Sequence, residues 1–409
     1  MMDALARLAS GARAELVDHI LPYWADRTID PVRGGFIGRI DGHDRPEPGA
    51  ARGAVLNARI LWTFSAACRT LQTDQWCDEA DEAYHALRDR FRDPDHGGIY
   101  WMVSASGEPT ETKKQVYAQA FAIYGLAEYV RHSKDAEALA WAQDLYRLIE
   151  RRAVDPVRGG YLEAFSREWG PLADVRLSEK DTDAPKTMNT HLHVLEAYTT
   201  LYHVWPDAGL AARIRALLDL FLDRVIDPVT GHLGSFFGMD WTPASGVVSY
   251  GHDIEASWLM DEAADVLGDD ELSTRVRTAS LRLARLACTE GLDEDGGLFN
   301  ERDASGHLDA DKHWWPQAEA VVGFLNAYAH TDDPAFARAA AQAWAFIQQH
   351  IIDREGGEWF FRVSRDGTPY REEDKVGPWK CPYHNARACM EIMHRVPTPE
   401  PLAARAHPA

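Results

Sequence analysis

A short turn motif recurs six times along this chain of 409 residues. Each copy has an Asp, two or three variable residues, and then Gly-Gly or a near equivalent before aromatic or aliphatic residues. The separations between successive copies are 63, 62, 72, 66 and 60 residues, and the copies begin at Asp30, Asp93, Asp155, Asp227, Asp293 and Asp353. Six copies at this spacing indicate an internal structural repeat.

Each repeat has the same plan of secondary structure. An amphipathic helix precedes the turn, as in residues 211–225, and an alternating strand–turn–strand segment follows it, as in residues 98–107. A second helix comes next, as in residues 116–130, and it is apolar on most faces, which is typical of a buried helix. Six such pairs predict an all-α (α/α)6 barrel with short β-hairpins between the outer and inner helices. An open solenoid is the alternative, but it would be expected to have atypical repeats at its ends.

The repeats extend over nearly the whole chain. We therefore expect a single barrel domain over residues 1–396. Residues 397–409, which are rich in Pro and Ala, are expected to form a flexible C-terminal tail.

The inner helices of such a barrel run in one direction, so the residues at their starts gather around one mouth. Residues 188–198 read M-N-T-H-L-H-V-L-E-A-Y and place Asn189, His193 and Glu196 on one helix face, with Asn189 or Thr190 as the expected N-cap. The other inner helices also start with polar and aromatic residues. Residues 166–187 form the longest connection before an inner helix, and we expect this loop to lie over the mouth, where it could act as a lid.

Composition limits the class of ligand. The net charge of −21 argues against nucleic acid or an anionic membrane surface as a partner. Five scattered cysteines without a C-x-x-C pair favour reduced thiols and a cytoplasmic location. No run is long and apolar enough to predict a membrane span. We expect a small-molecule ligand and a monomer or weak homodimer.

Three chemical readings of the mouth compete. His193, His252 and His384 with Glu255 could bind a metal, but no helix carries an H-E-x-x-H motif and Arg59 would lie beside the cation. A glycoside hydrolase needs two carboxylates, and Glu255 with Glu319 is the only evident pair. Apart from these three chemical readings, a sugar-binding barrel without catalysis would leave the three histidines unexplained.

The third reading is proton abstraction next to a sugar carbonyl. An imidazole can take and return a proton near neutral pH, and two of them on opposite faces of an enediolate would permit inversion at carbon 2. Arg59 would stabilise the developing oxyanion. His252 and Glu255 are one turn apart, so the carboxylate could orient the imidazole.

The motifs together resemble the N-acylglucosamine 2-epimerase superfamily. The resemblance is carried by L-N-A-R (56–59), residues 188–198, G-H-D-I-E-A-S-W (251–258), K-H-W-W-P-Q-A-E-A-V-V-G (312–323) and G-P-W-K-C-P-Y-H-N (377–385). It implies an (α/α)6 barrel and an enzyme that needs no cofactor or metal and epimerises the reducing-end glucose of β-1,4-linked disaccharides to mannose.

The resemblance also implies residue roles. His252 and His384 would be the acid/base pair at carbon 2, His193 would assist ring opening, Arg59 would bind the enediolate oxygens, and Glu255 would support His252. The expected sugar-contacting residues are Tyr117, Asn189, Trp315, Glu319 and Trp379. Relatives that act on free mannose, as 2-epimerases or isomerases, share this set of residues and remain the alternative.

Overall fold

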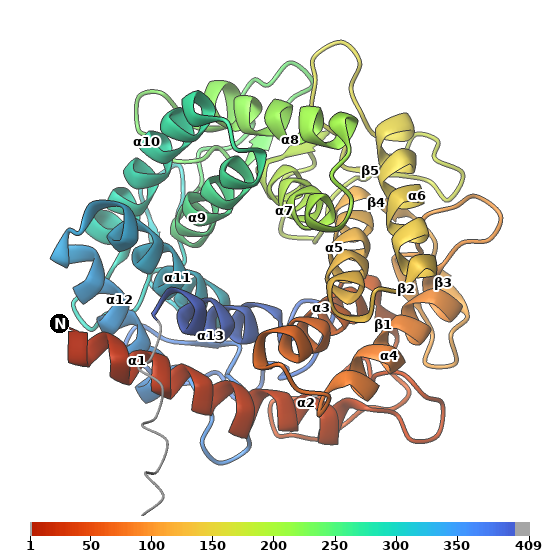
Figure 1. The fold of residues 1–409 in the computed structure, drawn as a ribbon, viewed down its shortest axis with the longest axis horizontal. Helices are drawn as coiled ribbons and strands as arrows, with labels where there is room; N and C mark the ends of the chain where they lie inside the picture. The colour runs from red at the N-terminus through yellow and green to blue at the C-terminus, as the bar shows by residue number, and fades with distance from the viewer. Residues whose placement is uncertain (1, 397–409) are drawn as a thin grey trace, which may run out of the picture.

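Helices in two concentric rings make up most of the computed structural model, which describes residues 2–396 (Figure 1). The six inner helices of this part of the chain each pack against the next around the ring, and α13 packs against α3. They are α3 (Ala54–Leu71), α5 (Val116–Ser133), α7 (Met188–Val204), α9 (Tyr250–Leu267), α11 (Trp314–Thr331) and α13 (Tyr383–Arg395). The fold is the expected (α/α)6 barrel.

The outer helices alternate with the inner ones along the chain, and several end in a π-helical turn before the Asp motif. They are α1–η1–α2 (Met2–Ala14, Glu15–Ile20, Leu21–Thr28), α4–η2 (Cys77–Ala86, Leu87–Phe91), α6 (Ala136–Arg152), α8–η3 (Ala208–Leu220, Phe221–Val225), α10–η4 (Asp270–Leu286, Ala287–Gly291) and α12–η5 (Pro334–Phe346, Ile347–Ile351). The amphipathic pattern of these segments buries one face of each against the inner ring.

Short antiparallel strands join neighbouring repeats. A strand that precedes an inner helix pairs with the hairpin of the next repeat, giving the pairs β1–β2, β4–β5, β6–β7, β8–β9 and β11–β12. The strands are β1 (Arg52–Gly53), β2 (Met102–Val103), β3 (Pro109–Glu111), β4 (Lys114–Gln115), β5 (Ala164–Phe165), β6 (Lys186–Thr187), β7 (Phe236–Phe237), β8 (Val248–Ser249), β9 (Glu301–Arg302), β10 (Leu308–Asp309), β11 (Lys312–His313) and β12 (Arg362–Val363).

The first and last repeats meet and close the ring. A bridge between Ile40 and Val376 repeats the strand pairing across this junction. The indole of Trp359 donates to Glu15 at 2.9 Å, and α1 packs against α12 and α13 (Figure 1). The barrel is therefore closed, and the open solenoid is excluded.

In most repeats, the Asp of the turn motif forms a buried ion pair with a lysine or arginine. The side chain of Asp155 accepts from the backbone of Val157 and Arg158, and its other oxygen lies 2.6 Å from the ammonium of Lys186, which is fully buried. Equivalent pairs are Arg52–Asp30, Lys114–Asp93, Lys312–Asp293 and Lys375–Asp353. The fourth repeat has Val248 at the position of the cation.

Two details at the starts of the inner helices differ from expectation. Helix α7 begins at Met188, and its N-cap is Thr187, whose hydroxyl accepts from the backbone of Thr190, so the expected cap at Asn189 or Thr190 is wrong. Some of the polar residues expected around the mouth are structural. The side-chain amide of Gln119, for example, accepts from the backbone N–H of Ile99 and donates to the carbonyl of the same residue. Gln317 makes the same two bonds with Leu298.

Residues 397–409, the expected tail, lie outside the described residues. Among residues 2–396, no helix combines the length and apolar character needed to cross a membrane.

Candidate active site

One cavity of about 250 Å³ lies where the inner helices begin. All of the predicted site residues except Glu319 line it: Arg59, Tyr117, Asn189, His193, His252, Glu255, Trp315, Trp379 and His384. Glu319 is fully buried and contacts His384. The repeat plan therefore brings together residues from all six inner helices or the segments that precede them.

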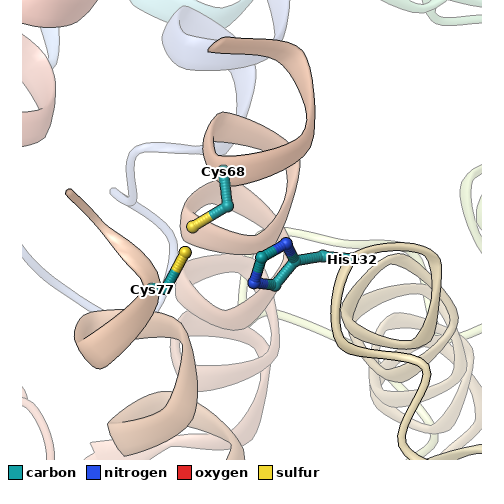
Figure 2. Close-up of side chains that lie close together, drawn as sticks. All are labelled: Cys68, Cys77 and His132. Atoms are coloured by element: carbon teal, nitrogen blue, oxygen red, sulfur yellow. The ribbon is translucent and has the colours of Figure 1, made fainter. Parts of the chain in front are cut away.

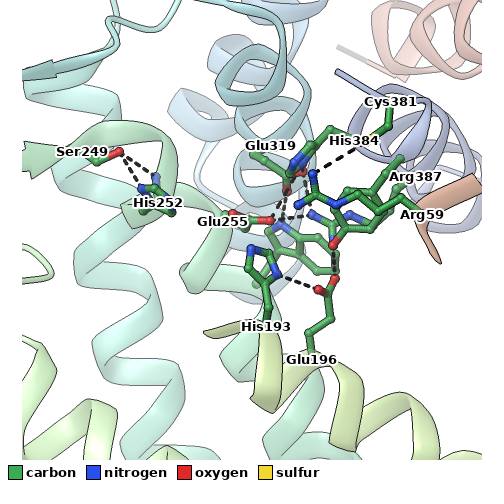
Figure 3. A network of polar contacts seen from close by, with 12 residues as sticks. Arg59, His193, Glu196, Ser249, His252, Glu255, Glu319, Cys381, His384 and Arg387 are labelled. Carbon is green, nitrogen blue, oxygen red and sulfur yellow. Dashed lines mark hydrogen bonds and ion pairs between the residues drawn. The ribbon is translucent and has the colours of Figure 1, made fainter. Parts of the chain in front are cut away.

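His384 is held by a carboxylate behind it. Its Nδ1 lies 2.7 Å from Glu319 Oε1 (Figure 3). The other oxygen of Glu319 accepts from the indole of Trp258 at 3.0 Å. With a proton on Nδ1 donated to the carboxylate, Nε2 is left as the basic nitrogen. Burial and the nearby cation of Arg59 lower the pKa of His384 well below its usual range, so the ring is neutral at pH 7.

Arg387 connects three buried carboxylates. Its Nη2 donates to Glu255 at 2.8 Å and to Glu319 at 2.7 Å, and its Nη1 contacts Glu196. Burial, reinforced by the neighbouring Glu319, raises the pKa of Glu255 to about 8. Because Glu255 is largely protonated at neutral pH, the guanidinium of Arg387 faces fewer than three full negative charges.

His193 is oriented within its own helix. Its Nδ1 lies 2.9 Å from Glu196 Oε2, one turn later on α7 (Figure 3). Although burial opposes the charge, Arg387 lowers the pKa of Glu196 to about 2. The ring of Tyr117 meets His193 edge-on at 5.1 Å between centroids.

His252 has a different partner from the one expected. Its Nδ1 lies 2.8 Å from the hydroxyl of Ser249, the N-cap residue of α9, and its ring lies 4.7 Å from that of Trp315. Glu255 bonds Arg387 instead, so the prediction that Glu255 orients His252 is wrong (Figure 3). Helical spacing placed the two residues close together, but the cation from α13 competes for the carboxylate. Burial lowers the pKa of His252 to about 3.

Arg59 supplies a buried cation to the cavity. Its Nη2 donates to the hydroxyl of Tyr117 at 2.8 Å, and Nη1 contacts Cys381 Sγ at 3.7 Å. The guanidinium lies over the rings of Phe121 and Tyr383, at 4.1 and 4.8 Å from their centroids. These aromatic faces hold the cation without neutralising it.

The remaining predicted residues provide surfaces suited to a sugar. Trp379 contacts Tyr117 and Trp101, and Trp315 lies between His252 and His384. The side-chain oxygen of Asn189 is buried and lacks a hydrogen-bond partner among the described residues. An unpaired amide oxygen at a cavity wall is available to a ligand hydroxyl.

Glu255, Glu319 and His384 also meet the distance requirement for a metal site, because their ligand atoms lie within 4.8 Å of one another. However, Arg387 Nη2 already lies between the two carboxylates, at 2.8 and 2.7 Å. A second cation there would face strong repulsion, so the residues do not fit a metal ion.

Sequence reasoning missed several residues of the site. It assigned no role to Arg387, Glu196 or Ser249, although Arg387 follows His384 by three positions and Glu196 shares a helix face with His193. Lys180, from the 166–187 loop, also lines the cavity, so this loop reaches the mouth as expected. The other lining residues that were not predicted are His313, Trp314 and Phe361.

The mouth of the (α/α)6 barrel combines histidines, a buried arginine and tryptophans, an arrangement suited to an enzyme that performs acid–base chemistry on a sugar. The family model for N-acylglucosamine 2-epimerase (GlcNAc 2-epimerase) matches residues 35–388, and the chain belongs to this family.

Individual relatives give a narrower comparison. The chain is 48% identical to a cellobiose 2-epimerase of Bacteroides fragilis, over 93% of this chain and 97% of that protein. It is 44% identical to a cellobiose 2-epimerase of Ruminococcus albus, over 95% of this chain and 99% of that protein. Its structure matches that of the cellobiose 2-epimerase from Bacillus thermoamylovorans B4167 with a TM-score of 0.91 at 42% identity, over 95% and 99% of the two chains.

Proposed function

We propose that this protein is a carbohydrate epimerase that converts the reducing-end glucose of a β-1,4-linked disaccharide, such as cellobiose or lactose, to mannose. The observation that carries the proposal is a pair of neutral histidines, His252 and His384, on one cavity with the buried cation of Arg59. The curated relatives named above support the disaccharide as substrate.

The proposed reaction proceeds by proton transfer at carbon 2. After ring opening, assisted by His193, one imidazole removes the proton from carbon 2 and the other delivers a proton to the opposite face of the enediolate. Each ring keeps its orientation through Nδ1, bonded to Ser249 in His252 and to Glu319 in His384. No redox or nucleotide cofactor is needed, because the reaction only moves protons.

Arg59 is proposed to make this proton transfer feasible. Neutral imidazole is a weak base for a sugar C–H, so the negative charge that develops on the enediolate oxygens must be stabilised. A preorganised donor to an oxyanion contributes about 3 kcal/mol in enzymes of known mechanism. Arg59 is buried and already oriented by Tyr117 and two aromatic faces, so little reorganisation is required.

The glycoside hydrolase reading has weaker support. Hydrolysis needs two carboxylates that flank the scissile bond. Glu255 and Glu319 instead bond the same nitrogen of Arg387, and Glu319 does not line the cavity. Free mannose remains the second candidate substrate, because the catalytic set would serve it equally.

One incubation separates these activities. The protein is treated with a chelator and incubated in heavy water with cellobiose, lactose, mannose or N-acetylmannosamine, and the products are followed by chromatography and NMR. We expect deuterium at carbon 2 of the disaccharide epimers with the glycosidic bond intact. Release of monosaccharides would favour a hydrolase, a ketose product would favour an isomerase, and turnover only of mannose would overturn the disaccharide assignment.

We also propose the organisation that accompanies this function. Residues 1–396 are one catalytic domain, which acts as a monomer or weak homodimer. A cytoplasmic location is consistent with the five free cysteines.

A further inference from the structure

Two thiols and an imidazole meet far from the candidate active site. Sγ of Cys68, Sγ of Cys77 and a ring nitrogen of His132 lie within 4.8 Å of one another, and Figure 2 shows the two sulfur atoms facing each other beside the imidazole ring. Cys68 lies in α3, Cys77 is the first residue of α4, and His132 is in the last turn of α5. The fold thus joins two cysteines that the sequence showed only as scattered residues.

The cluster lies toward the end of the barrel opposite the cavity. Cys68 follows Arg59 by nine residues on α3, which corresponds to roughly 14 Å along the helix. Cys68 is buried, whereas Cys77 and His132 are half-buried, so the cluster can be reached from solvent. No step of the proposed reaction uses it.

The ligand types select a class of cation. Two cysteines and a histidine suit zinc and similar borderline or soft divalent ions, whereas magnesium and calcium prefer oxygen. Tetrahedral zinc has Zn–S bonds of about 2.3 Å and Zn–N bonds of about 2.0–2.1 Å, so ligand atoms must be about 3.5–3.8 Å apart. The atoms of each pair therefore need to approach by at most about 1.3 Å to bind the ion.

The surroundings also favour a cation. Four acidic residues lie within four positions of Cys77 in the chain: Asp74, Asp78, Glu79 and Asp81. The Cys77 thiol donates to the carbonyl of Thr73 at 3.5 Å. A divalent cation replaces both thiol protons and leaves two thiolates whose charge it balances.

We propose that Cys68, Cys77 and His132 form a binding site for a zinc-class divalent cation, with a water molecule as the fourth ligand. The bound ion would connect the ends of α3, α4 and α5, which belong to the first two repeats. Because metal binds the folded chain through groups that the unfolded chain does not preorganise, occupancy raises the melting temperature.

The test uses cobalt(II) as a spectroscopic probe of the full chain, reduced and freed of metal. We expect one equivalent to bind with a thiolate-to-cobalt charge-transfer band, two protons to be released per metal, and the melting temperature to rise. Cys68→Ser and Cys77→Ser should remove the band, and His132→Gln should weaken binding by about tenfold or more, since even the loss of a group supporting a ligand costs about 10–100-fold.

Cys288→Ser is the matched control, because Cys288 is another half-buried thiol and lies in η4. This variant should keep the band and the affinity of the original chain. If Cys68→Ser fails to fold by circular dichroism, the half-buried Cys77 and His132 variants carry the test. Absence of the band at excess cobalt, or its persistence in the Cys77→Ser variant, would overturn the proposal. Conversion of the two thiols to a disulfide in place of metal binding would also overturn it.

Discussion

Arg387 is the residue on which the buried charges of the site depend. It contacts Glu196, Glu255 and Glu319, and all four side chains are nearly inaccessible to solvent. Removing one partner of a buried ion network leaves uncompensated charge, which typically costs about 3–5 kcal/mol. The cost is electrostatic, so it depends on the charge of this residue more than on its volume.

We predict that Arg387→Met lowers the free energy of unfolding by about 3–5 kcal/mol and abolishes epimerisation, because Glu196 and Glu319 then lose the cation that fixes them. Arg387→Lys should recover only part of the stability and of the activity, because an ammonium lacks the planar set of donors with which a guanidinium bonds carboxylates. Urea unfolding and an activity assay measure these effects. Arg147→Met, at an exposed arginine paired with the exposed Asp144, is the control and should cost about 1 kcal/mol or less. Equal losses in the two Met variants would contradict the role given to Arg387.

Ser249 acts on His252 through one hydroxyl that also caps α9. We predict that Ser249→Ala lowers kcat by about three- to tenfold, corresponding to one hydrogen bond of about 0.5–1.5 kcal/mol, with KM little changed. Ser249→Thr should restore most of the rate because it keeps the hydroxyl. Ser257→Ala, which removes a bond to Ile254 within the same helix, should leave kcat unchanged. A wild-type kcat in Ser249→Ala would show that this bond does not position the base.

His191 is a structural histidine that accepts from the backbone of Tyr161 at 2.8 Å. Burial lowers its pKa to about 4, below its usual value near 6.5. The unfolded chain therefore binds a proton that the folded chain does not, and this group's stabilisation is complete above pH 6.5 and declines as the pH falls toward 4.

Gln119 and Gln317 make the equivalent contact in other repeats, so His191→Gln is a substitution that the fold already uses. We predict that this variant keeps its activity at pH 7 and loses stability less steeply between pH 6.5 and 4, by up to about 1.4 kcal/mol per pH unit. Urea unfolding at several pH values measures the slope. An unchanged slope would mean that His191 is not held neutral.

At the scale of elements, the turn of each repeat can be compared with its copies. Asp155 and Asp227 make the same two backbone contacts in their turns, but only Asp155 also balances a buried lysine, Lys186. Asparagine keeps an acceptor oxygen for the turn and removes the charge.

We predict that Asp155→Asn lowers the free energy of unfolding by about 3–5 kcal/mol, because Lys186 is left charged and unpaired in the interior. Asp227→Asn should cost less than about 1 kcal/mol, in the range of ordinary surface substitutions. Thermal and urea unfolding of the two variants make the comparison. Similar losses would show that the turn, and not the ion pair, is what the Asp stabilises.

The sequence was sufficient for the fold because its evidence is local and repeated. The Asp turns and the contrast between amphipathic and apolar helices recur in every copy, and the helix starts converge once the ring closes. The sequence was not sufficient to predict which groups the site residues bond. Spacing placed Glu255 near His252, but Arg387 comes from another helix and takes that carboxylate, and Ser249 ends a strand whose pairing depends on the next repeat.

At the scale of the whole molecule, closure of the ring is what creates the site. Arg59 comes from the first inner helix and His384 from the last, and both line one cavity only because α13 packs against α3. His252 reaches the same cavity from α9. The two proposed bases are thus on separate helices, with α11 between them.

The most direct test of this account is hydrogen exchange at carbon 2 in the His252→Asn and His384→Asn variants. Each is incubated in heavy water with a glucose-type and, separately, a mannose-type disaccharide, and deuterium is located by NMR. The account predicts that both variants fold, that neither epimerises, and that each exchanges the proton of one epimer only, with opposite preferences. Near-wild-type epimerisation in either variant, or exchange from the same epimer in both, would contradict the two-base assignment.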